Sequence, residues 1–487
     1  MSASRSLSDP LANFTSTLGT ALNFLSGFVS RVFPASVFLP LLAAFLLHPT
    51  GSTAQPASDP TSSLLLTDAR LVDPATKTVR RGALRIEEER IAAVLDEAPA
   101  NFDGHTLDLN GKWVLPGLVD AHVHSWGNTG PAFQQRQMLQ TTGSAKMMLY
   151  SGVTAFLDLA SPEDYILNLR NRQRSEGFLG ADIHAAGVPF THPSGHGTQY
   201  PGSSARTVTS PEEARRSVDS LAARQSDVAK LIYNPNNDHY PSMDRATMEA
   251  TIDAAHAHDL TTVAHIETWA AAHQVVTAGA DAITHTPPSP LPDSTLTAMQ
   301  EQGTAWIPTL TVHTEAAHLI QHPEHLQNDL LRAVADSALL AAYRDTSGLP
   351  NGIRSWIGRQ ATYRKARLNA VQKGAAAGVP ILTGTDAGNP GVFQGYSLHR
   401  ELILLEQAGL SNWEVLTAVT TAAGDFLDAP FGLQPGDRAN LLVLDASPLD
   451  DIRHSQTVHR VIYHGQVVDR SRLLNEATSS PPSVPTR

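Results

Sequence analysis

Short apolar runs alternate with helical stretches through the middle of the chain. Each run is bounded by small or polar residues, as buried strands are, whereas stretches between them such as 244–258 carry apolar residues at helical spacing. The eight runs lie at 114–125, 153–159, 182–187, 227–233, 261–267, 282–286, 305–312 and 379–386. This alternation predicts an α/β fold, a closed (β/α)8 barrel of the TIM type with its active site at the carboxyl ends of the strands. An open doubly wound sheet is the alternative, although no Gly-x-Gly-x-x-Gly motif follows the first strand.

The two ends of the chain carry a different pattern, in which short alternating runs are separated by Gly, Pro and Asp. This pattern occupies 62–111 and returns in 439–445 and 459–469, and it predicts hairpins. Because chain ends commonly lie close together, we expect both to build one small β-sandwich domain into which the barrel is inserted. The expected bounds are 61–115 and 431–475 for the two parts of the β domain and 116–430 for the barrel.

Residues 1–60 resemble an export signal followed by a linker. A basic flank precedes an apolar run from Val32 to Leu47, and small residues follow up to Ala54, where cleavage would occur. The run is shorter than the ~20 residues that span a bilayer, so we expect a cleaved signal peptide and a periplasmic or secreted protein without a stable membrane anchor. An anchored form stays open. At the other end, 476–487 has the composition of a disordered tail.

Two long segments interrupt the alternation in the middle of the chain. Residues 189–206 form a loop rich in Gly, Pro and Ser after the third strand, and 313–358 form a longer, partly helical excursion after the seventh. In a barrel both would lie over the mouth of the active site, where long loops usually set the shape of the substrate.

Composition narrows the class of protein further. The chain has 487 residues, of which 41% are hydrophobic and 17% charged, as in an ordinary globular protein. Its net charge of −12 argues against a nucleic-acid surface, because phosphates are bound by Lys and Arg. It contains no cysteine, which excludes disulfides, thiolate ligands and Cys nucleophiles. A metal ion would therefore have to be held by His, by carboxylates or by a modified Lys.

Polar residues lie at the ends of several predicted strands. His122 and His124 are two residues apart, so on a strand they would project from the same face, and imidazole is a common zinc ligand. Further polar residues lie within or at the end of later apolar runs, where an unpaired polar group would cost a few kcal/mol. They are Lys230, His265, His285 and Asp386. Because a barrel points its strand ends at a common centre, we expect these six side chains to share a partner, although each alone could be an ordinary core residue.

Lys230 is the most informative of the six. It lies between apolar neighbours, where burial would lower its pKa from ~10.4 and leave a neutral amine. A neutral amine can react with carbon dioxide to give an anionic carbamate, which can bridge two cations. Lys230 could instead extend to the surface.

A set of short motifs is spread over the chain from about Leu64 to Val468. They are P-G-L-V-D-A-H-V-H at 116–124, L-Y-S-G-V-T at 149–154, S-G-H-G at 194–197, K-L-I-Y at 230–233, V-A-H at 263–265, A-G-A-D-A-I-T-H at 278–285, T-G-T-D-A-G at 383–388 and G-L-Q-P-G-D-R-A-N-L-L-V-L-D at 432–445. Together they resemble the amidohydrolase superfamily, and within it the imidazolonepropionase-like branch that includes metal-dependent Xaa-Pro and other dipeptidases.

The resemblance implies two divalent cations, with zinc as the expected ion. One cation would be held by His122, His124 and Asp386, and the other by His265 and His285. Lys230, carboxylated by carbon dioxide, would bridge both, and a hydroxide between the two metals would be the nucleophile.

The resemblance also implies roles in catalysis. Asp386 would take the proton of the attacking hydroxide and pass it to the leaving nitrogen. His196, in the S-G-H-G motif, would polarise the substrate carbonyl, and Tyr233 would contact the substrate. Ile266 to Thr268 depart from the family pattern, as do the residues after His285, and both lie near the expected mouth, which leaves the substrate open.

We therefore expect an exported metal-dependent hydrolase that cleaves an amide or peptide C–N bond in a small molecule, such as an Xaa-Pro dipeptide or an N-acyl amino acid. A mononuclear cyclic-amide hydrolase or deaminase, similar to imidazolonepropionase, is one alternative, and a phosphotriester or lactone hydrolase is another. A non-catalytic scaffold that keeps the fold is a third. The sequence leaves the exact substrate and the metal open, as well as whether the chain forms a homo-oligomer.

Overall fold

The computed structural model describes residues 63–132, 136–199, 205–235, 239–429 and 431–478. The signal segment expected before Ala54 therefore lies outside the described residues, as does 479–487 of the expected tail. Residues 476–478 of that tail lie in helix α14 (Arg470–Thr478). Within the described ranges, no helix is long and apolar enough to cross a bilayer.

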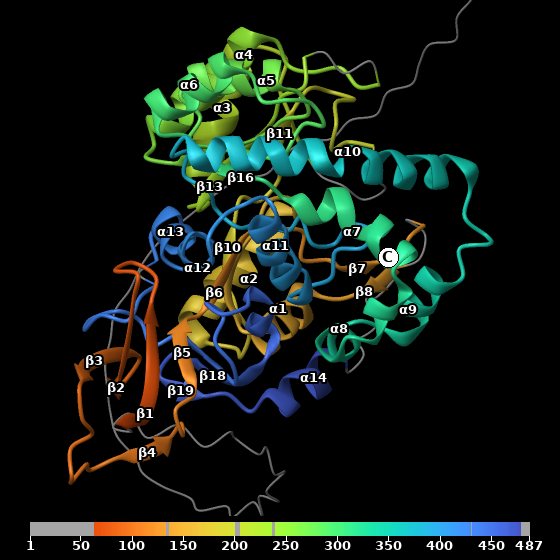
Figure 1. Ribbon diagram of the computed structural model, residues 1–487. Coiled ribbons are helices and arrows are strands. Elements are labelled where there is room, and N and C mark those ends of the chain that lie inside the picture. Colours follow the sequence, from red (N-terminus) through yellow and green to blue (C-terminus); the bar gives the residue numbers. More distant parts are fainter. Residues whose placement is uncertain (1–62, 133–135, 200–204, 236–238, 430, 479–487) are drawn as a thin grey trace, which may run out of the picture. The chain divides into compact units, whose positions relative to one another are not determined.

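The strands of the barrel form two parallel sheets, ordered β10-β9-β6 and β12-β11-β13-β14-β15-β16 (Figure 1). Their bounds are β6 (Leu118–Val123), β9 (Val153–Asp158), β10 (Asp182–Ala185), β11 (Phe190–Thr191), β12 (Arg206–Thr207), β13 (Val228–Ile232), β14 (Thr261–His265), β15 (Ala282–Thr284) and β16 (Ala305–Ile307). Most parallel pairs are joined by a crossover that carries helix, which is how parallel strands are usually connected, whereas β11 and β12 are joined by a loop.

The two parallel sheets are linked at both of their ends. On one side, the amide of Asp227, just before β13, donates to the carbonyl of Ala185 at the end of β10. On the other side, the extended segment 379–387 lies between β16 and β6, with parallel bridges from Ile381 to Trp306 and from Ala387 to Val123. The eighth predicted strand is therefore an extended segment held by single bridges.

The inner face of these strands forms one apolar core. Each of the eight segments contributes at least one buried side chain to it, including Val119, Leu157, Ala186, Val228, Val263, Ala282, Ile307 and Leu382. Alternate residues of the same strands, such as Ala264 beside Val263, belong to the larger core beneath the helices. This two-sided burial is that of a filled barrel and confirms the predicted (β/α)8 class.

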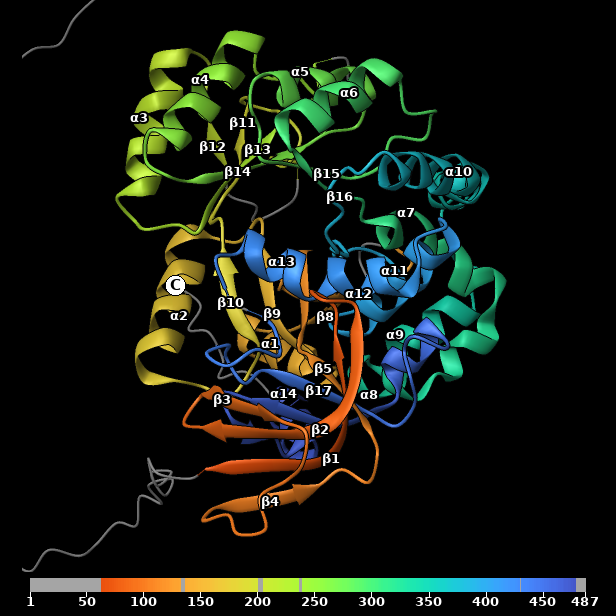
Figure 2. The same cartoon turned by 60° about the vertical axis from the view of Figure 1, so that its left-hand side comes forward.

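Helices α3 (Pro211–Ala222), α4 (Arg245–His256), α5 (Trp269–Thr277) and α6 (Asp293–Gln302) lie against the outer side of β13 to β16 (Figure 2). The first three begin at polar residues whose side chains accept a hydrogen bond from the third helical amide. These N-caps are Ser210, Asp244 and Thr268. The remaining helices of the barrel are α1 (Thr141–Tyr150), α2 (Glu163–Glu176), α7 (Leu310–Gln321), α10 (Asn351–Ala376), α11 (Tyr396–Gln407), α12 (Asn412–Val419) and α13 (Thr421–Phe426).

Strands from both ends of the chain form one eight-stranded sheet, as the sequence predicts. Their bounds are β1 (Leu64–Asp73), β2 (Thr78–Glu87), β3 (Arg90–Leu95), β4 (His105–Asp108), β5 (Trp113–Pro116), β17 (Leu441–Leu444), β18 (Val458–Tyr463) and β19 (Gln466–Val467). The two ends meet where β5 pairs with β17, and the apolar side chains of Val114 and Val443 lie in the same core.

The seventh strand is shorter than predicted. The sequence suggests strand over 305–312, but β16 ends at Ile307 and helix α7 begins at Leu310. The carboxylate of Glu401, on α11, accepts hydrogen bonds from the amides of Leu310 and Thr311 at 2.9 and 2.8 Å and so caps α7 from a distant part of the chain. The excursion after it contains the 3-10 helix η1 (Pro323–Gln327), α8 (Asp329–Val334) and α9 (Ser337–Arg344), and it continues into α10.

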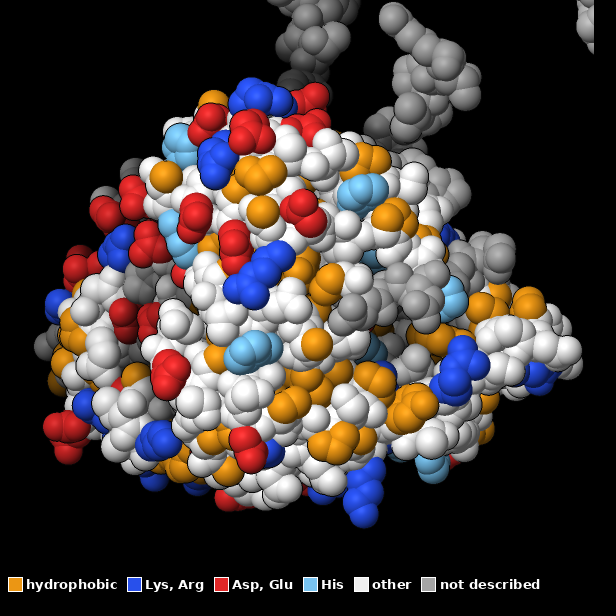
Figure 3. All heavy atoms as spheres, turned by 90° about the horizontal axis from the view of Figure 1, so that it is seen from above, with side chains coloured by type: hydrophobic (Ala, Val, Ile, Leu, Met, Phe, Trp, Pro, Cys, Tyr) orange, Lys and Arg blue, Asp and Glu red, His pale blue; other side chains and the backbone are white. Residues whose placement is uncertain are grey.

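Charged side chains of both signs are mixed over the face drawn in Figure 3, where Lys and Arg lie scattered among Asp and Glu. Nucleic-acid-binding proteins instead gather their basic side chains on one face or along one helix. The mixed charges on the described part of this face and the negative net charge both argue against a nucleic-acid surface.

Candidate metal centre

The six polar residues predicted to share a partner line one cavity of about 350 Å³. They come from the carboxyl ends of β6, β13, β14 and β15 and from the extended segment 379–387. Strand alternation explains the placement, because residues such as Lys230 and Ile232 on β13 point inward while Leu231 packs in the outer core. The cavity thus lies where the active site of a (β/α)8 barrel is expected.

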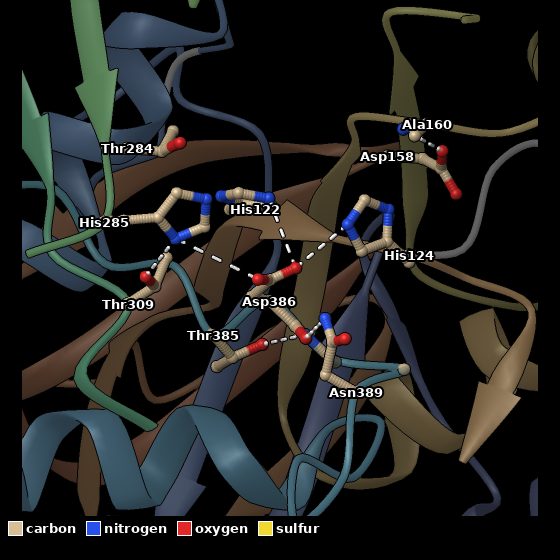
Figure 4. Close-up of polar contacts among 12 residues, drawn as sticks. His122, His124, Asp158, Ala160, Thr284, His285, Thr309, Thr385, Asp386 and Asn389 are labelled. Carbon is tan, nitrogen blue, oxygen red and sulfur yellow. Dashed lines mark hydrogen bonds and ion pairs between the residues drawn. The ribbon is translucent and has the colours of Figure 1, made fainter. Parts of the chain in front are cut away.

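Asp386 is at the centre of the first group of residues (Figure 4). Its Oδ1 lies 2.9 Å from Nε2 of His124 and 3.4 Å from Nε2 of His122, and its Oδ2 lies 4.0 Å from Nδ1 of His285. Asp386 and His285 both have positive φ angles, 62° and 81°. Such backbone strain in residues other than glycine is concentrated at functional sites.

The electrostatics of this group favour neutral imidazoles around an ionised carboxylate. Burial lowers the pKa of His122 and of His285 well below the ordinary value. Burial opposes ionisation of Asp386, but its interaction with the rings of His122 and His124 holds the pKa of this carboxyl below its ordinary value. Neutral imidazole and carboxylate are the protonation states in which these side chains bind cations.

Several buried polar atoms of the site make no hydrogen bond of good geometry with a described residue, although Oδ1 of Asp386 has its ion-pair contact with His124. They include Oδ1 of Asp386 and Nε2 of His265, as well as Nδ1 of both His122 and His124. Because unpaired buried polar atoms are costly, an ion that Asp386 and His265 coordinate would relieve the cost at those two atoms. His122, His124 and Asp386 have ligand atoms close enough to one another to hold a single cation. The residues present therefore fit a metal centre.

The second group of residues surrounds His265. Its Nε2 lies 3.6 Å from Oε1 of Glu267, and the same oxygen lies 3.9 Å from Nδ1 of His196. These three residues also have ligand atoms close enough for one cation. The His265 ring lies 4.3 Å from that of His285, between centroids, so the structure brings together the pair that the sequence assigns to the second metal. Glu267 is a further carboxylate beside that pair.

Lys230 is near enough to both groups to influence His122 and His265, and its Nζ donates to Oγ1 of Thr284 at 3.1 Å. Burial lowers the pKa of Lys230 to about 7, so the amine is substantially neutral near neutral pH. The hydroxyl of Thr309 lies 2.9 Å from Nδ1 of His285, which leaves Nε2 of that ring for another partner.

The tautomer of His196 is fixed by its neighbour Gln199. The amide of Gly197 donates to Oε1 of Gln199 at 2.6 Å, so the Gln199 side-chain nitrogen faces the ring and donates to Nδ1 of His196 at 3.3 Å. Burial lowers the pKa of His196 to about 4, and the ring is therefore neutral. A neutral imidazole that accepts at Nδ1 carries its proton on Nε2, and this Nε2–H is a donor.

Tyr233 does not lie at this site. It follows Lys230 by three positions, and strand alternation turns it to the outer face, where its ring is buried in the core beneath the helices. Its hydroxyl donates to Oε1 of Gln274, on α5, at 2.5 Å. The sequence placed Tyr233 by its proximity to Lys230 and did not apply the alternation.

Two aromatic residues near the site escaped the sequence analysis. The Trp126 ring stacks on that of His124, with centroids 4.6 Å apart and an angle of 4° between the planes. His313 is half-buried on α7, its ring centroid is 5.9 Å from that of His285, and its buried Nε2 has no hydrogen-bond partner among the described residues. Trp126 could have been found from its spacing of two after His124, but the sequence predicts that His313 begins the excursion after the seventh strand, whereas it lies in the first turn of α7.

A larger cavity of about 470 Å³ lies at the opposite, amino ends of the strands. Asp182, Asp227 and Thr261, at the starts of β10, β13 and β14, are among the residues that line it. Conserved features at this end of such barrels usually serve stability, whereas catalysis takes place at the carboxyl ends. The smaller cavity is therefore the candidate for chemistry.

Comparison with known proteins places this geometry in a family. The amidohydrolase family profile matches residues 113–468. An uncharacterized protein of Mycobacterium tuberculosis is 27% identical over 347 residues, which span 70% of this chain and 80% of that protein. The solved structure of a Xaa-Pro dipeptidase with bound methionine has a TM-score of 0.69 at 20% identity, over 84% of this chain and 100% of that one. A prolidase candidate from Bifidobacterium longum gives 0.64 at 27% identity, over 86% and 100%.

Proposed function

Since the chain belongs to the amidohydrolase family and is a hydrolase of carbon–nitrogen bonds, we propose that its substrate is a dipeptide such as Xaa-Pro or an N-acyl amino acid. The observation that carries this proposal is the convergence of four histidines, Lys230 and Asp386 on one cavity of about 350 Å³. A cavity of this volume suits a small molecule. The similarity to the Bifidobacterium longum prolidase candidate, at 27% identity over the whole of that chain, supports a peptide-like substrate.

Amidohydrolases are generally metal-dependent, and the donor set supports two divalent cations. His122, His124 and Asp386 would hold one ion and His265 and His285 the other, with zinc as the expected metal. When bound, two such ions would polarise a carbonyl and lower the pKa of a water molecule from 15.7 toward about 7, which supplies hydroxide at neutral pH.

Lys230 would join the two metal positions as a carbamate. Its buried amine, with a pKa of about 7, is a nucleophile at neutral pH. The amine forms a C–N bond to carbon dioxide and releases one proton, which gives a carboxylate with two oxygens. Each oxygen could serve one cation, and the anion would offset part of their charge.

The protein groups that move or hold protons are Asp386 and His196. Asp386 is ionised, so its Oδ2 can accept the proton of the attacking hydroxide and then deliver it to the leaving nitrogen. His196 carries its proton on Nε2 and can donate it in a hydrogen bond to the carbonyl oxygen, where negative charge develops.

The wall of the cavity supports a substrate with an apolar part. Trp126, Met138, Leu159 and Ile232 line it beside the metal ligands, and Arg136 is a basic side chain in the same lining. A dipeptide or an N-acyl amino acid offers an apolar side chain or acyl group together with a carboxylate, which matches apolar contacts and one guanidinium.

A panel of Xaa-Pro dipeptides and N-acyl amino acids tests the proposal, with wild type, Lys230→Ala and the control Lys365→Ala assayed after purification with zinc and bicarbonate. Lys365 is an exposed lysine on α10. We expect about two metals per chain and hydrolysis in wild type and control, with both clearly reduced in Lys230→Ala. One metal in all three proteins would favour a mononuclear cyclic-amide hydrolase or deaminase, and metal binding without any hydrolysis would favour the scaffold.

Export is a separate part of the proposal. The basic flank and apolar run before Ala54 support cleavage and release from the membrane. Expression of the full chain in a bacterial host, followed by intact mass measurement of the periplasmic protein, would detect a form that begins at Gln55. Recovery of only the full-length chain in the cytoplasm would contradict export.

A further inference from the structure

Three histidines lie together where helix α7 ends, and none of them lines the candidate metal centre. His318 is on the last turn of α7, His322 directly follows the helix, and His325 lies in η1. The amide of His322 still donates to the carbonyl of His318 at 2.8 Å, so these two residues are one helical turn apart on the same face. Pro323 ends the helix, and η1 then returns His325 to that face.

The rings of these residues are in contact. Nε2 of His318 lies 2.5 Å from Nδ1 of His325, and the two ring centroids are 4.6 Å apart. The His322 ring centroid is 4.8 Å from that of His318 and 5.9 Å from that of His325. The contact between His318 and His325 is that of a hydrogen bond between two imidazoles, and the His322 ring beside them could supply a third nitrogen.

The protonation states suit ligands for a cation. Burial lowers the pKa of His318 to about 4 and that of His325 in the same direction, so both rings are neutral near pH 7. The two charged side chains that act on His318, Arg400 and Glu315, offset each other because they form an ion pair at 2.8 Å. Glu324, whose Oε1 lies 3.3 Å from Nδ1 of His322, adds one carboxylate at the edge of the cluster.

We propose that His318, His322 and His325 form a second metal site, which takes one divalent ion of the zinc or nickel type. Two nitrogens bound to a tetrahedral zinc at about 2.0–2.1 Å are roughly 3.3 Å apart, so the His318 and His325 nitrogens need to separate by less than an ångström. The three residues do not yet bring their ligand atoms as close together as the two groups of the catalytic cavity do, so the His322 ring would have to turn toward the pair. Half of its side chain is exposed, which leaves room for that rotation. All three donors are imidazoles, which zinc, nickel and copper prefer over the oxygen ligands that magnesium and calcium choose.

An ion at this site would fasten the end of α7 to η1 and thereby the start of the excursion that follows. The excursion contacts the hairpin β7 (Gly127–Thr129) and β8 (Arg136–Met138), since Nδ2 of Asn128 donates to the carbonyl of Val334 at 3.2 Å. The amide of Asp336 also donates to Oε1 of Gln137 at 3.1 Å. Because β8 carries lining residues of the candidate active site, the ion would stabilise the wall of that cavity from outside.

Counting zinc tests the proposal independently of the catalytic activity. Wild type, His322→Gln, His325→Gln and the control His256→Gln are loaded with zinc, dialysed against about 10 μM free zinc, and measured by elemental analysis. His256 is an exposed histidine on α4 that pairs with Asp281. We expect one ion more per chain in wild type and control than in the two cluster variants, with the affinity of the extra ion reduced at least about tenfold in those variants.

A thermal scan separates a bound ion from a structural hydrogen bond. Added zinc should raise the melting temperature of wild type and of His256→Gln, and it should raise that of His322→Gln and His325→Gln less. Should His325→Gln fail to fold, the half-exposed His322→Gln decides the question. Equal zinc content and equal thermal response in all four proteins would overturn the proposal. The catalytic ligands are unchanged in every variant. The zinc count therefore tests the second site whether or not the protein hydrolyses the proposed substrates.

Discussion

The two ends of the barrel hold similar residues in different electrostatic surroundings. At the amino ends, Asp227 is paired with Arg170 at 2.7 Å and with Arg174 at 2.9 Å, and it accepts the amide of Ala185. At the carboxyl ends, buried atoms of Asp386 and His265 have ion-pair contacts but make no hydrogen bond of good geometry with a described residue. Each cluster combines a buried residue, Arg170 or Asp386, with partly accessible ones, so the two ends differ mainly in the partners of their polar atoms. A satisfied polar cluster stabilises a fold, whereas an unsatisfied one reduces stability until a ligand arrives.

The strongest test of this comparison is Asp386→Asn, which keeps the size of the side chain and removes its charge. We expect kcat/KM to fall at least about a thousandfold, because proton transfer by a positioned carboxylate is itself worth about 10²–10⁴ and a cation ligand is weakened as well. Steady-state kinetics with the best dipeptide, together with metal analysis, would measure the loss. The control is Asp219→Asn, at an exposed carboxylate on α3. A loss of less than about tenfold would show that Asp386 is not part of the chemistry.

Lys230→Met should stabilise the protein when metal and bicarbonate are absent. Burial places the pKa of Lys230 at about 7, below its ordinary 10.5, so between these values the unfolded chain binds a proton that the folded chain releases. Stability therefore rises with pH across this window, and the full cost is present below pH 7. At 1.36 kcal/mol per pKa unit, the variant should gain roughly 3–5 kcal/mol at pH 7.

Urea unfolding at pH 7, 8.5 and 10 would check this expectation, since the advantage of Lys230→Met should fade as pH rises. Lys365→Met, at an exposed position, should show no such trend. If Lys230→Met is no more stable than wild type at pH 7, the buried amine is already satisfied by Thr284 and the comparison of the two ends is too simple.

Asp227→Ala should have the opposite effect, because it leaves Arg170 buried without its partner. Removal of one member of a buried pair costs about 3–5 kcal/mol, and we expect about 3 here, since Asp227 is partly accessible. Burial opposes ionisation of Asp227, but His184 and the two arginines lower its pKa. Its contribution is therefore present above about pH 3.9 and is lost as pH falls through the folded value.

Urea unfolding at pH 7 measures the first effect, and kcat/KM per folded molecule measures whether the catalytic end is disturbed. We expect kcat/KM to stay within about twofold of wild type, because Asp227 lies at the amino end of β13 and Lys230 lies further along toward the carboxyl end. A large loss of activity in protein that is still folded would mean that the two ends are coupled.

The sequence could locate the six candidate ligands because strand alternation and the convergence of strand ends are local rules. His122 and His124 share a face by their spacing alone, and Lys230 is conspicuous among apolar neighbours. The same rule would have turned Tyr233 away from the site, since it is an odd number of positions from Lys230. The two-ended β sheet was also predictable, because its alternating pattern occurs at both ends of the chain.

What the sequence could not give depends on contacts between distant residues. Helix α7 begins at Leu310 because Glu401 caps it, and 91 positions separate the two residues. That early start places His313 in the first turn of the helix and its ring beside that of His285, whereas the sequence predicts strand up to residue 312. The tautomer of His196 likewise depends on how a loop folds back on itself, and no pattern of residue types specifies that.

The smallest expected effect is that of Gln199→Glu, which tests the wall of the carboxyl-end cavity. The Gln199 amide donates to Nδ1 of His196, whereas a carboxylate there can only accept and would draw the proton onto Nδ1. Nε2 would then lose the hydrogen that we assign to the substrate carbonyl. We expect kcat to fall about tenfold, or roughly 1.4 kcal/mol of transition-state stabilisation, with KM changed less. Gln199→Ala should lose less, because either tautomer can then form. An equal fall in both variants would mean that the tautomer is unimportant and that Gln199 only supports the loop.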